Sequence, residues 1–467
     1  MNIRQRISKS NSKNTPYLTD ELSCGNFKNE KQENHQSGFK LGGNSEHVNN
    51  GMKELRIRLG NIDSQIGDIL ARTLDGQEVS KDAAVILFQS KGFELDALVA
   101  TADMIREMSV GNKASFVITR NINFTNVCYM GCKFCGFAKR KEDHGAELLS
   151  MDEIADRAHE AWERGATEVC IQGGLHPDID GNHYRNILSA IKKRVPQIHI
   201  HAFSPFEIWF GARKSRVSVA EFIQDLMDHG LDSMPGTAAE ILDVQVRQQL
   251  TKDKLTTEQW IEIITTAHQL GLPTTATIMY GHIDEPRHWA EHIALIRDIQ
   301  KKTGGFSEFV PLGFVHYESP LFVNQKENDM VVRPGPTLEE NIRMHAISRL
   351  MLNGWINNIQ ASWVKLGPVY AQQMLQSGAN DLGGTLMNES ISRSSGGKHG
   401  QEIVPADMVK MISEAGRTAI RRNTLYKELE VFPVVQTETM GLSQECEISG
   451  LTSQSGQLIA STGGYTA

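Results

Sequence analysis

The sequence has 467 residues, of which 40% are hydrophobic and 22% are charged, so the chain can bury a large core without a disulfide framework. Its 48 basic and 56 acidic side chains give a formal net charge of −8, and no basic stripe is present, which argues against a nucleic-acid binder. No apolar run reaches the roughly 18 residues that a transmembrane helix needs, so no membrane span is expected.

The two ends of the chain differ in texture from the rest. Residues 1–51 and 436–467 are polar and lack a persistent helical or strand period, so we expect both to be disordered. Apolar residues recur at helical spacing over 52–108, which predicts an N-terminal helical layer within 52–112. The remaining segment, 113–435, is expected to form the main domain.

The main domain alternates strand-like and helix-like segments. Strands are expected at 116–124, 168–171, 198–203, 231–233, 274–280, 309–315, 356–363 and 380–383. Helices are expected at 151–165, 184–194, 219–229, 239–249, 257–270, 286–302, 338–352, 369–376 and 405–422. Eight strand–helix units in series favour an α/β fold of the (β/α)8 barrel type over an open doubly wound sheet. In such a barrel the functional side chains lie at the C-terminal ends of the strands.

The strongest chemical signal is the spacing Cys128-x-x-x-Cys132-x-x-Cys135, just after the first expected strand. Three thiolates can hold three irons of a [4Fe–4S] cluster and leave the fourth iron open to a small molecule. Phe134 would then form an apolar lid over the cluster. A structural zinc site needs four ligands, and an electron-transfer ferredoxin needs a fourth nearby cysteine. Neither alternative finds its fourth ligand at the usual spacing.

This cysteine triplet in a barrel resembles the radical S-adenosylmethionine (SAM) enzymes. The resemblance implies one [4Fe–4S] cluster per chain, SAM bound at the open iron, and an external electron donor. It also implies that Gly173 and Gly174 contact the methionine part of SAM and that Ser204 reaches its ribose. Glu240 would contact the ribose or amino group, and Arg247 would pair with the carboxylate from the same helix face. The alternatives are a tight turn for the glycines and a solvated ion pair for Glu240 and Arg247.

Further polar residues gather at the later strand ends. A general base is expected among Tyr280, His282 and His316, although a lone histidine is more often structural. Expected substrate contacts are Trp363, Asn380, Asp381, Thr385 and Glu389, and the segment that holds Trp363 also holds Lys365.

Segments spread over the whole barrel narrow the resemblance. They include SPFEIW, DSMPGTAAEIL, KLTTEQW, TTATIMYGHID, SWVKLG and GANDLGGTLMNESIS. Together they resemble the family of FO synthase subunit 2 (the CofH type). The resemblance implies transfer of the 4-hydroxybenzyl group of L-tyrosine to 5-amino-6-(D-ribitylamino)uracil, in biosynthesis of the deazaflavin FO. It further implies FO synthase subunit 1 as the functional partner.

Two alternatives stay open on the sequence alone. Menaquinone-pathway relatives, such as aminofutalosine synthase or dehypoxanthine futalosine cyclase, share the triplet and the barrel but would leave free tyrosine inert. A non-enzymatic iron–sulfur or zinc protein would show no spectral response to SAM. The absence of an apolar leader in residues 1–30 and the clustering of the cysteines predict a reducing, cytoplasmic location.

Overall fold

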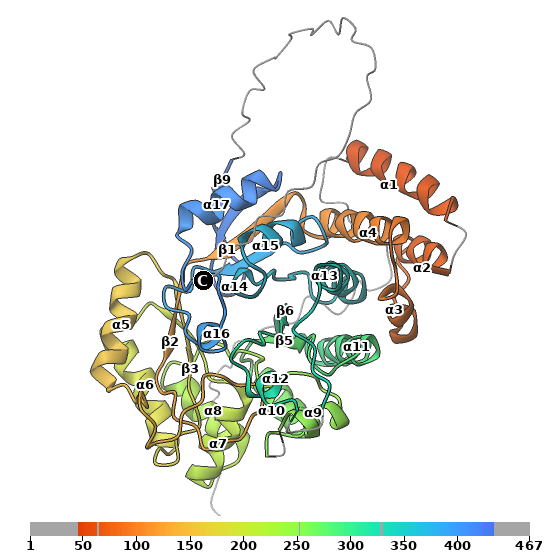
Figure 1. Cartoon of the computed structure of the whole chain (residues 1–467). Helices are drawn as coiled ribbons and strands as arrows, with labels where there is room; N and C mark the ends of the chain where they lie inside the picture. Colours follow the sequence, from red (N-terminus) through yellow and green to blue (C-terminus); the bar gives the residue numbers. More distant parts are fainter. Residues whose placement is uncertain (1–44, 63–64, 252, 327–329, 434–467) are drawn as a thin grey trace, which may run out of the picture. The chain divides into compact units, whose positions relative to one another are not determined.

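Within the part of the chain that the structure describes, four helices precede the first strand (Figure 1). The computed structural model describes residues 45–62, 65–251, 253–326 and 330–433. The four helices are α1 (Ser45–Gly60), α2 (Gln65–Leu74), α3 (Lys81–Leu87) and α4 (Phe93–Val110). Leu70 and Leu98 on this layer are fully buried in a core that the layer shares with later helices. The structure thus has helices where the helical periodicity predicts them.

The first helix begins earlier than expected. Helix α1 starts at Ser45, inside the segment predicted to be a disordered tail, and Val48 is only 2% exposed. A buried valine gives this turn the apolar contact that the polar composition around it does not suggest. The rest of that tail and the tail at 436–467 lie outside the described residues.

Parallel strands form a closed ring in the middle of the described chain. They are β1 (Lys113–Val117), β2 (Thr119–Asn123), β3 (Glu168–Gln172), β4 (His199–Ala202), β5 (Thr274–Tyr280), β6 (Phe306–Gly313) and β7 (Asp381–Gly384). Strand pairs β2–β3, β3–β4, β5–β6 and β7–β1 are parallel. Single parallel bridges close the gaps, at His201–Ser233, Met234–Thr274, Phe309–Ile359 and Gln360–Asp381.

This ring confirms the (β/α)8 barrel. Strands β1 and β2 are one strand interrupted at Ile118, while 233–234 and 359–360 supply the fourth and seventh strand positions. The expected strands at 231–233 and 356–363 therefore shrink to single bridges. A barrel of this kind places its loops and their side chains together at the C-terminal ends of the strands.

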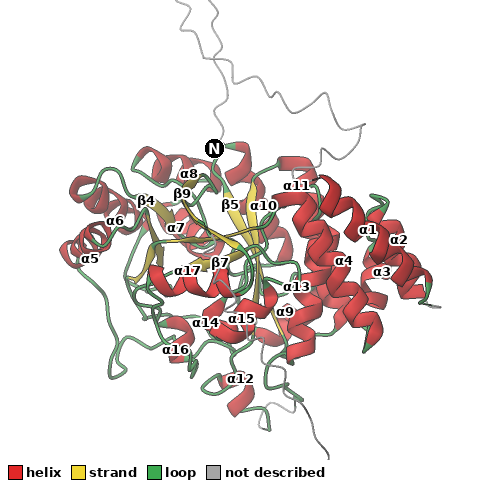
Figure 2. Ribbon diagram, turned by 90° about the horizontal axis from the view of Figure 1, so that it is seen from above, coloured by secondary structure: helices red, strands yellow, loops and turns green. Residues whose placement is uncertain are grey.

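Helices surround the strands (Figure 2). They are α5 (Met151–Glu163), α6 (Gly181–Arg194), α7 (Pro205–Ser215), α8 (Val219–Asp228), α9 (Val244–Leu250), α10 (Thr257–Gln269), α11 (Pro286–Thr303), α12 (Pro320–Val323), α13 (Leu338–Leu352), α14 (Trp363–Leu366), α15 (Pro368–Met374), α16 (Ile391–Ser394) and α17 (Pro405–Glu414). Several begin at capping boxes, in which a Ser or Thr and a Glu or Gln three residues later satisfy each other's backbone N–H groups. Helix α7 was not expected, although Ser204, Pro205 and Glu207 carry the same signal.

Two expected helices end or begin elsewhere. The helix expected at 239–249 begins only at Val244, because Asp243 caps it by accepting the Val246 N–H at 2.8 Å. The helix expected at 405–422 ends at Glu414, and Gly416 takes a left-handed φ of 74° just beyond it.

A short hairpin follows α17 in place of the expected helical residues. It consists of β8 (Thr418–Arg422), which pairs in parallel with β1, and β9 (Glu428–Phe432), which pairs antiparallel with β8. The hairpin brings Arg422 into the barrel interior. No helix among the described residues is both long and apolar enough to cross a membrane.

Candidate active site

A cavity of about 440 Å³ runs through the barrel interior to the loops at the C-terminal ends of the strands. Side chains from β2, β3, β4, β5, β6 and β7 line it, among them Thr119, Cys170, His201, Thr277, Val310 and Leu382. Its volume falls within the range of roughly 300–1,000 Å³ that small-molecule sites occupy. The cavity therefore has the size of a small-molecule binding site.

The three motif cysteines all line this cavity, on the loop that follows β2. The backbone N–H of Cys128 donates to the Lys139 carbonyl at 2.9 Å, and that of Cys135 donates to the Cys132 carbonyl at 3.2 Å. All three thiols are free of disulfide bonds. Burial raises the pKa of Cys132 to about 11 and also raises the pKa of Cys135. Their thiolates therefore need nearby positive charge, which bound iron supplies.

The donor set fits a cluster better than a single ion. Among the residues that the structure describes, no three His, Cys, Asp or Glu side chains converge closely enough to hold one metal ion. In a [4Fe–4S] cluster each thiolate binds a different iron, so its ligands surround the cluster and do not meet at one point. Three thiols on one loop that line the same cavity fit that requirement.

An ion pair and an aromatic ring line the cavity beside the cysteines. They are formed by Glu240, Lys254 and Phe134. Lys254 forms an ion pair with Glu240, and its ammonium lies 4.8 Å from the centroid of the Phe134 ring. Glu240 holds a left-handed φ of 44°, and Ala238 nearby has a φ of 62°. Such strain in non-glycine residues concentrates at functional sites.

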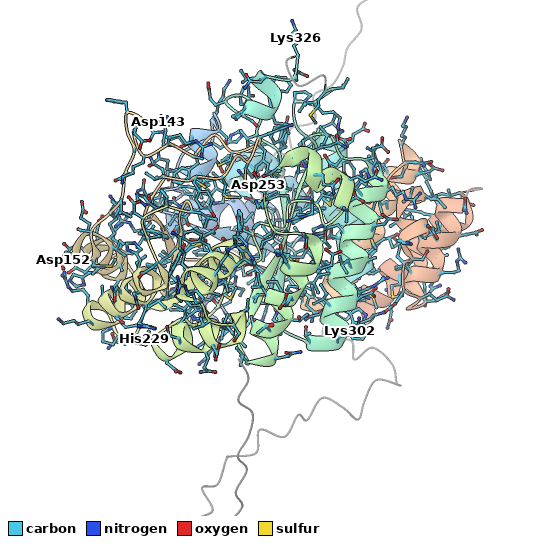
Figure 3. All side chains as sticks on the ribbon, turned by 90° about the horizontal axis from the view of Figure 1, so that it is seen from below. Asp143, Asp152, His229, Asp253, Lys302 and Lys326 are labelled. Carbon is cyan, nitrogen blue, oxygen red and sulfur yellow. The ribbon has the colours of Figure 1, made fainter. Side chains whose placement is uncertain are left out.

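Lys254 was not among the predicted site residues, although it opens the KLTTEQW segment. It follows an exposed turn whose Asp253 is labelled in Figure 3. A lysine in a polar turn gives no local sign that its side chain reaches inward. The charge of Lys254 lowers the pKa of Cys132, which burial otherwise raises.

The two predicted glycines line the cavity because they let β3 approach the cysteine loop. A Cβ at Gly174 would lie 2.3 Å from the carbonyl oxygen of Val127, and one at Gly173 would lie 2.5 Å from the Phe124 ring. Any side chain at either position would push the loop away. The glycines therefore fix the distance between the end of β3 and the cysteines, whatever else they contact.

A buried carboxylate on α7, the helix that follows β4, contacts this glycine pair. Glu207 is 1% exposed and accepts hydrogen bonds from the Gly173 N–H at 2.9 Å and from the Ser204 hydroxyl at 2.6 Å. Burial raises the pKa of Glu207 to about 7. Ser204, a predicted contact to SAM, lines the cavity and also caps helix α7.

Arg247 does not line the cavity, in contrast to the prediction. It lies on α9, which begins at Val244, so Arg247 shares no helix with Glu240. Its guanidinium is buried and donates to the backbone carbonyls of Leu255 and Ala239, among others. Arg247 therefore holds the strained turn that carries Glu240, and its donors are already satisfied.

The three predicted candidates for the general base also lie outside the cavity lining. Tyr280 is fully buried and donates its hydroxyl to Asn341 Oδ1 at 2.5 Å. His282 is fully buried, and both ring nitrogens are engaged by backbone groups at 2.8–3.0 Å. His316 packs against the ring of Tyr317 at a centroid distance of 4.1 Å. Each has a structural partner that sequence spacing does not reveal.

The five predicted substrate contacts divide into two groups. Trp363 and Glu389 line the cavity. Asn380, Asp381 and Thr385 lie behind its wall, where they bind neighbouring strands. Asn380 Oδ1 accepts from Arg349, Asp381 accepts from Arg422, and the Thr385 hydroxyl donates to the Thr119 carbonyl.

A second charged group includes residues near the N-terminal ends of β6 and β7, and two of its members, Glu308 and Arg422, line the cavity. We call Glu308, Asp381, Arg422 and Tyr426 the floor cluster. Arg422 donates to both carboxylate oxygens of Asp381, at 2.6 and 3.0 Å, and lies 3.7 Å from Glu308. Tyr426 donates to Glu308 at 2.5 Å, and burial raises the pKa of Glu308 to about 7. Sequence analysis missed this cluster because it placed Arg422 in a helix.

Comparison with protein families defines the class. The model of the radical SAM superfamily matches residues 122–296, and the model of the CofH/MqnC C-terminal region matches residues 303–434. Methylornithine synthase (PylB) shares the fold with a TM-score of 0.58 and 15% identity, over 76% of this chain and 97% of that one. The hydrogenase maturase HydG from Carboxydothermus hydrogenoformans does so with a TM-score of 0.59 and 16% identity, over 82% and 85%. The chain is a radical SAM protein, a class that implies a [4Fe–4S] cluster and SAM.

Curated relatives narrow the class to a family. FO synthase of Streptomyces coelicolor is 50% identical over 366 residues, which cover 78% of this chain and 42% of that protein. The 5-amino-6-(D-ribitylamino)uracil–L-tyrosine 4-hydroxyphenyl transferase of Methanothermobacter thermautotrophicus is 45% identical over 370 residues, which cover 79% of this chain and 99% of that enzyme. The chain thus spans less than half of the FO synthase but nearly all of the transferase. It belongs to the family of these 4-hydroxyphenyl transferases, as the CofH resemblance predicts.

Proposed function

We propose that this protein transfers the 4-hydroxybenzyl group of L-tyrosine to 5-amino-6-(D-ribitylamino)uracil, a step in the biosynthesis of FO. One observation carries the proposal: three cysteines line a single barrel cavity in a chain that matches the transferase over 99% of its length. In this reaction the Cα–Cβ bond of tyrosine breaks, the benzylic carbon becomes bonded to C5 of the uracil, and the rest of the amino acid leaves as a glycine-derived imine.

The cysteine loop would hold the cluster, with Cys128, Cys132 and Cys135 each on one iron. When bound, the cluster supplies the single electron that cleaves SAM to methionine and a deoxyadenosyl radical. Phe134 would cover the cluster, and Lys254 would offset the negative charge of its thiolates. The electron would come from an external donor.

The cavity itself excludes water from a reactive radical, and its polar groups orient the substrates. Because Tyr280, His282 and His316 lie outside its lining, we assign the general base to Glu308. Glu308 faces the cavity, and its pKa of about 7 lets it accept a proton from a phenol or amine near neutral pH. Arg422 at 3.7 Å stabilises the ionised form.

The partner follows from the longer relatives. The FO synthase of Streptomyces coelicolor extends well beyond the 42% of its length that matches this chain. We propose that FO synthase subunit 1 performs the remaining ring closure on the product of this enzyme.

The test is an anaerobic assay of the reconstituted enzyme with reductant, SAM, L-tyrosine and the diaminouracil, read by mass spectrometry. We expect deoxyadenosine together with a hydroxybenzyl–uracil adduct, and loss of both in Cys132→Ala. Deoxyadenosine that forms only with a futalosine-type nucleoside would contradict the proposal and favour the menaquinone-pathway relatives. Zinc in place of iron would contradict radical chemistry altogether.

A further inference from the structure

The residues that line the cavity come from two parts of the chain. One part matches the model of the whole superfamily, and the other matches the model of a narrower family. The superfamily model covers 122–296, which carries the cysteines, the glycine pair and Glu240. The narrower CofH/MqnC model covers 303–434, which carries Trp363, Lys365 and Glu389. Cluster and SAM are common to the superfamily, so side chains that recognise a particular substrate belong in the second part.

Lys365 stands out among the basic residues of the cavity. It lies on α14, just after the seventh strand position, and lines the cavity. Lys254 is paired with Glu240, and Arg422 is paired with Asp381. The backbone N–H of Lys365 donates to the Ser362 carbonyl, but its side-chain ammonium forms no ion pair or hydrogen bond with any residue that the structure describes. A buried ammonium without a partner is costly, which is why such groups usually face a ligand.

Glu389 provides an opposite charge in the lining of the same cavity. It lines the cavity after β7, and its two carboxylate oxygens accept the Ser392 N–H at 2.8 and 3.0 Å, which fixes the orientation of the carboxylate. Glu389 is the charged group with the largest influence on Lys365, yet the two side chains form no ion pair. We call Lys365 and Glu389 the head-group pair. Two opposite charges that line one cavity without forming an ion pair are both available to bind a zwitterion.

We propose that the head-group pair binds the backbone end of the amino-acid substrate: Lys365 binds the α-carboxylate, and Glu389 binds the α-ammonium. This inference rests on the proposed function, because it takes L-tyrosine as the substrate. Charge-assisted hydrogen bonds at both ends fix the position of Cα, the atom whose bond to Cβ breaks.

The position of Lys365 is consistent with a second source of the same chemistry, because SAM also carries an α-carboxylate and an α-ammonium. The location in the CofH/MqnC region favours tyrosine. The experiment therefore measures both ligands on the same protein.

The test is equilibrium binding to the cluster-loaded enzyme without reductant, with SAM present. The ligands are L-tyrosine, tyramine, which lacks the carboxylate, and 3-(4-hydroxyphenyl)propionate, which lacks the amine. In Lys365→Met the Kd for tyrosine is expected to rise by roughly tenfold to a hundredfold, as for the loss of one charge-assisted hydrogen bond. The Kd for tyramine should stay the same. In Glu389→Gln the Kd for tyrosine should rise, and the Kd for 3-(4-hydroxyphenyl)propionate should stay the same.

Two further variants guard against misfolding. Lys365→Arg keeps the charge and should retain tyrosine binding within a fewfold. Lys410→Met removes a surface lysine whose side chain is 70% exposed and should leave every Kd unchanged. Glu389→Gln keeps an acceptor for the Ser392 N–H, so the fold of that turn is retained.

Two results would overturn the inference. Wild-type affinity for tyrosine in Lys365→Met would remove Lys365 from the site. Weaker binding of SAM with unchanged binding of tyrosine would assign the pair to SAM. If the wild-type enzyme forms the adduct while the variants bind tyrosine normally, only this inference fails. If the wild-type enzyme neither binds tyrosine nor forms the adduct, the proposed function fails with it.

Discussion

Buried charges are paired at one end of the cavity, whereas a buried ammonium at the other end has no ion pair with a described residue. In the floor cluster Arg422 is held by Asp381 and lies near Glu308, which also accepts from Tyr426. At the opposite end Lys365 has no ion pair with a described residue. Charges that satisfy one another close a structure, whereas charges that face open space are available to a ligand. The paired charges of the floor cluster stabilise the fold, although Glu308 among them is also our proposed base, whereas we propose that the unpaired charge of Lys365 binds the head group of the substrate.

The largest effect is expected from breaking the floor cluster. Arg422→Met leaves the fully buried Asp381 without its cation, and breaking a buried ion pair costs about 3–5 kcal/mol. Denaturant unfolding of the variant should show that loss of unfolding free energy. An unchanged midpoint would mean that the floor does not stabilise the barrel.

A smaller effect is expected at the other end of the barrel, where the cysteine loop meets β3. In Gly174→Ala the added Cβ would lie 2.3 Å from the Val127 carbonyl oxygen, so the loop must shift. Overpacking of this kind costs roughly 1–3 kcal/mol. The variant should also bind less iron after reconstitution, because the cysteine loop has moved. Full iron loading would show that the loop adapts without cost.

The floor also predicts a pH dependence. The folded-state pKa of Glu308 is raised from 4.5 to about 7, so the folded state binds this proton more tightly than the unfolded state. The resulting stability is fully present below pH 4.5 and is lost as the pH rises through about 7. Glu308→Gln removes this dependence. In thermal unfolding, the stability of the variant relative to the wild type should therefore rise between pH 4.5 and about 7. Parallel pH curves would contradict the raised pKa.

The smallest effect on stability is expected from the head-group pair. Lys365→Met removes a buried charge that forms no ion pair with a described residue, so the melting temperature should stay the same or rise. Thermal unfolding of this variant beside Arg422→Met tests the comparison directly. A large loss of stability in Lys365→Met would show that both ends are structural.

Much of the architecture could be predicted because its signals are local. The apolar, β-branched run at β5 and the capping box before α13 gave the bounds that the structure has, Thr274–Tyr280 and Leu338–Leu352. The cysteine triplet, the glycine pair and Glu389 line the cavity because residues at strand ends meet there in any barrel. These features need only short windows of sequence.

The structure departs from the expected placements where a contact depends on tertiary structure. Tyr280 looks catalytic at a strand end, but it is paired with Asn341, 61 residues later. Arg247 resembles a carboxylate ligand, but its donors are taken up by backbone carbonyls of its own turn. Arg422 enters the cavity only because a hairpin replaces the end of the expected helix. None of these contacts has a spacing that sequence periodicity could reveal.

The most direct test of the central claim follows one carbon atom. The reconstituted enzyme is given tyrosine labelled with carbon-13 at Cβ, together with SAM, reductant and the diaminouracil. The account predicts that the label appears in the carbon bonded to the uracil ring, with deoxyadenosine formed alongside, and that Cys132→Ala yields neither product. Consumption of SAM without a labelled adduct would contradict it.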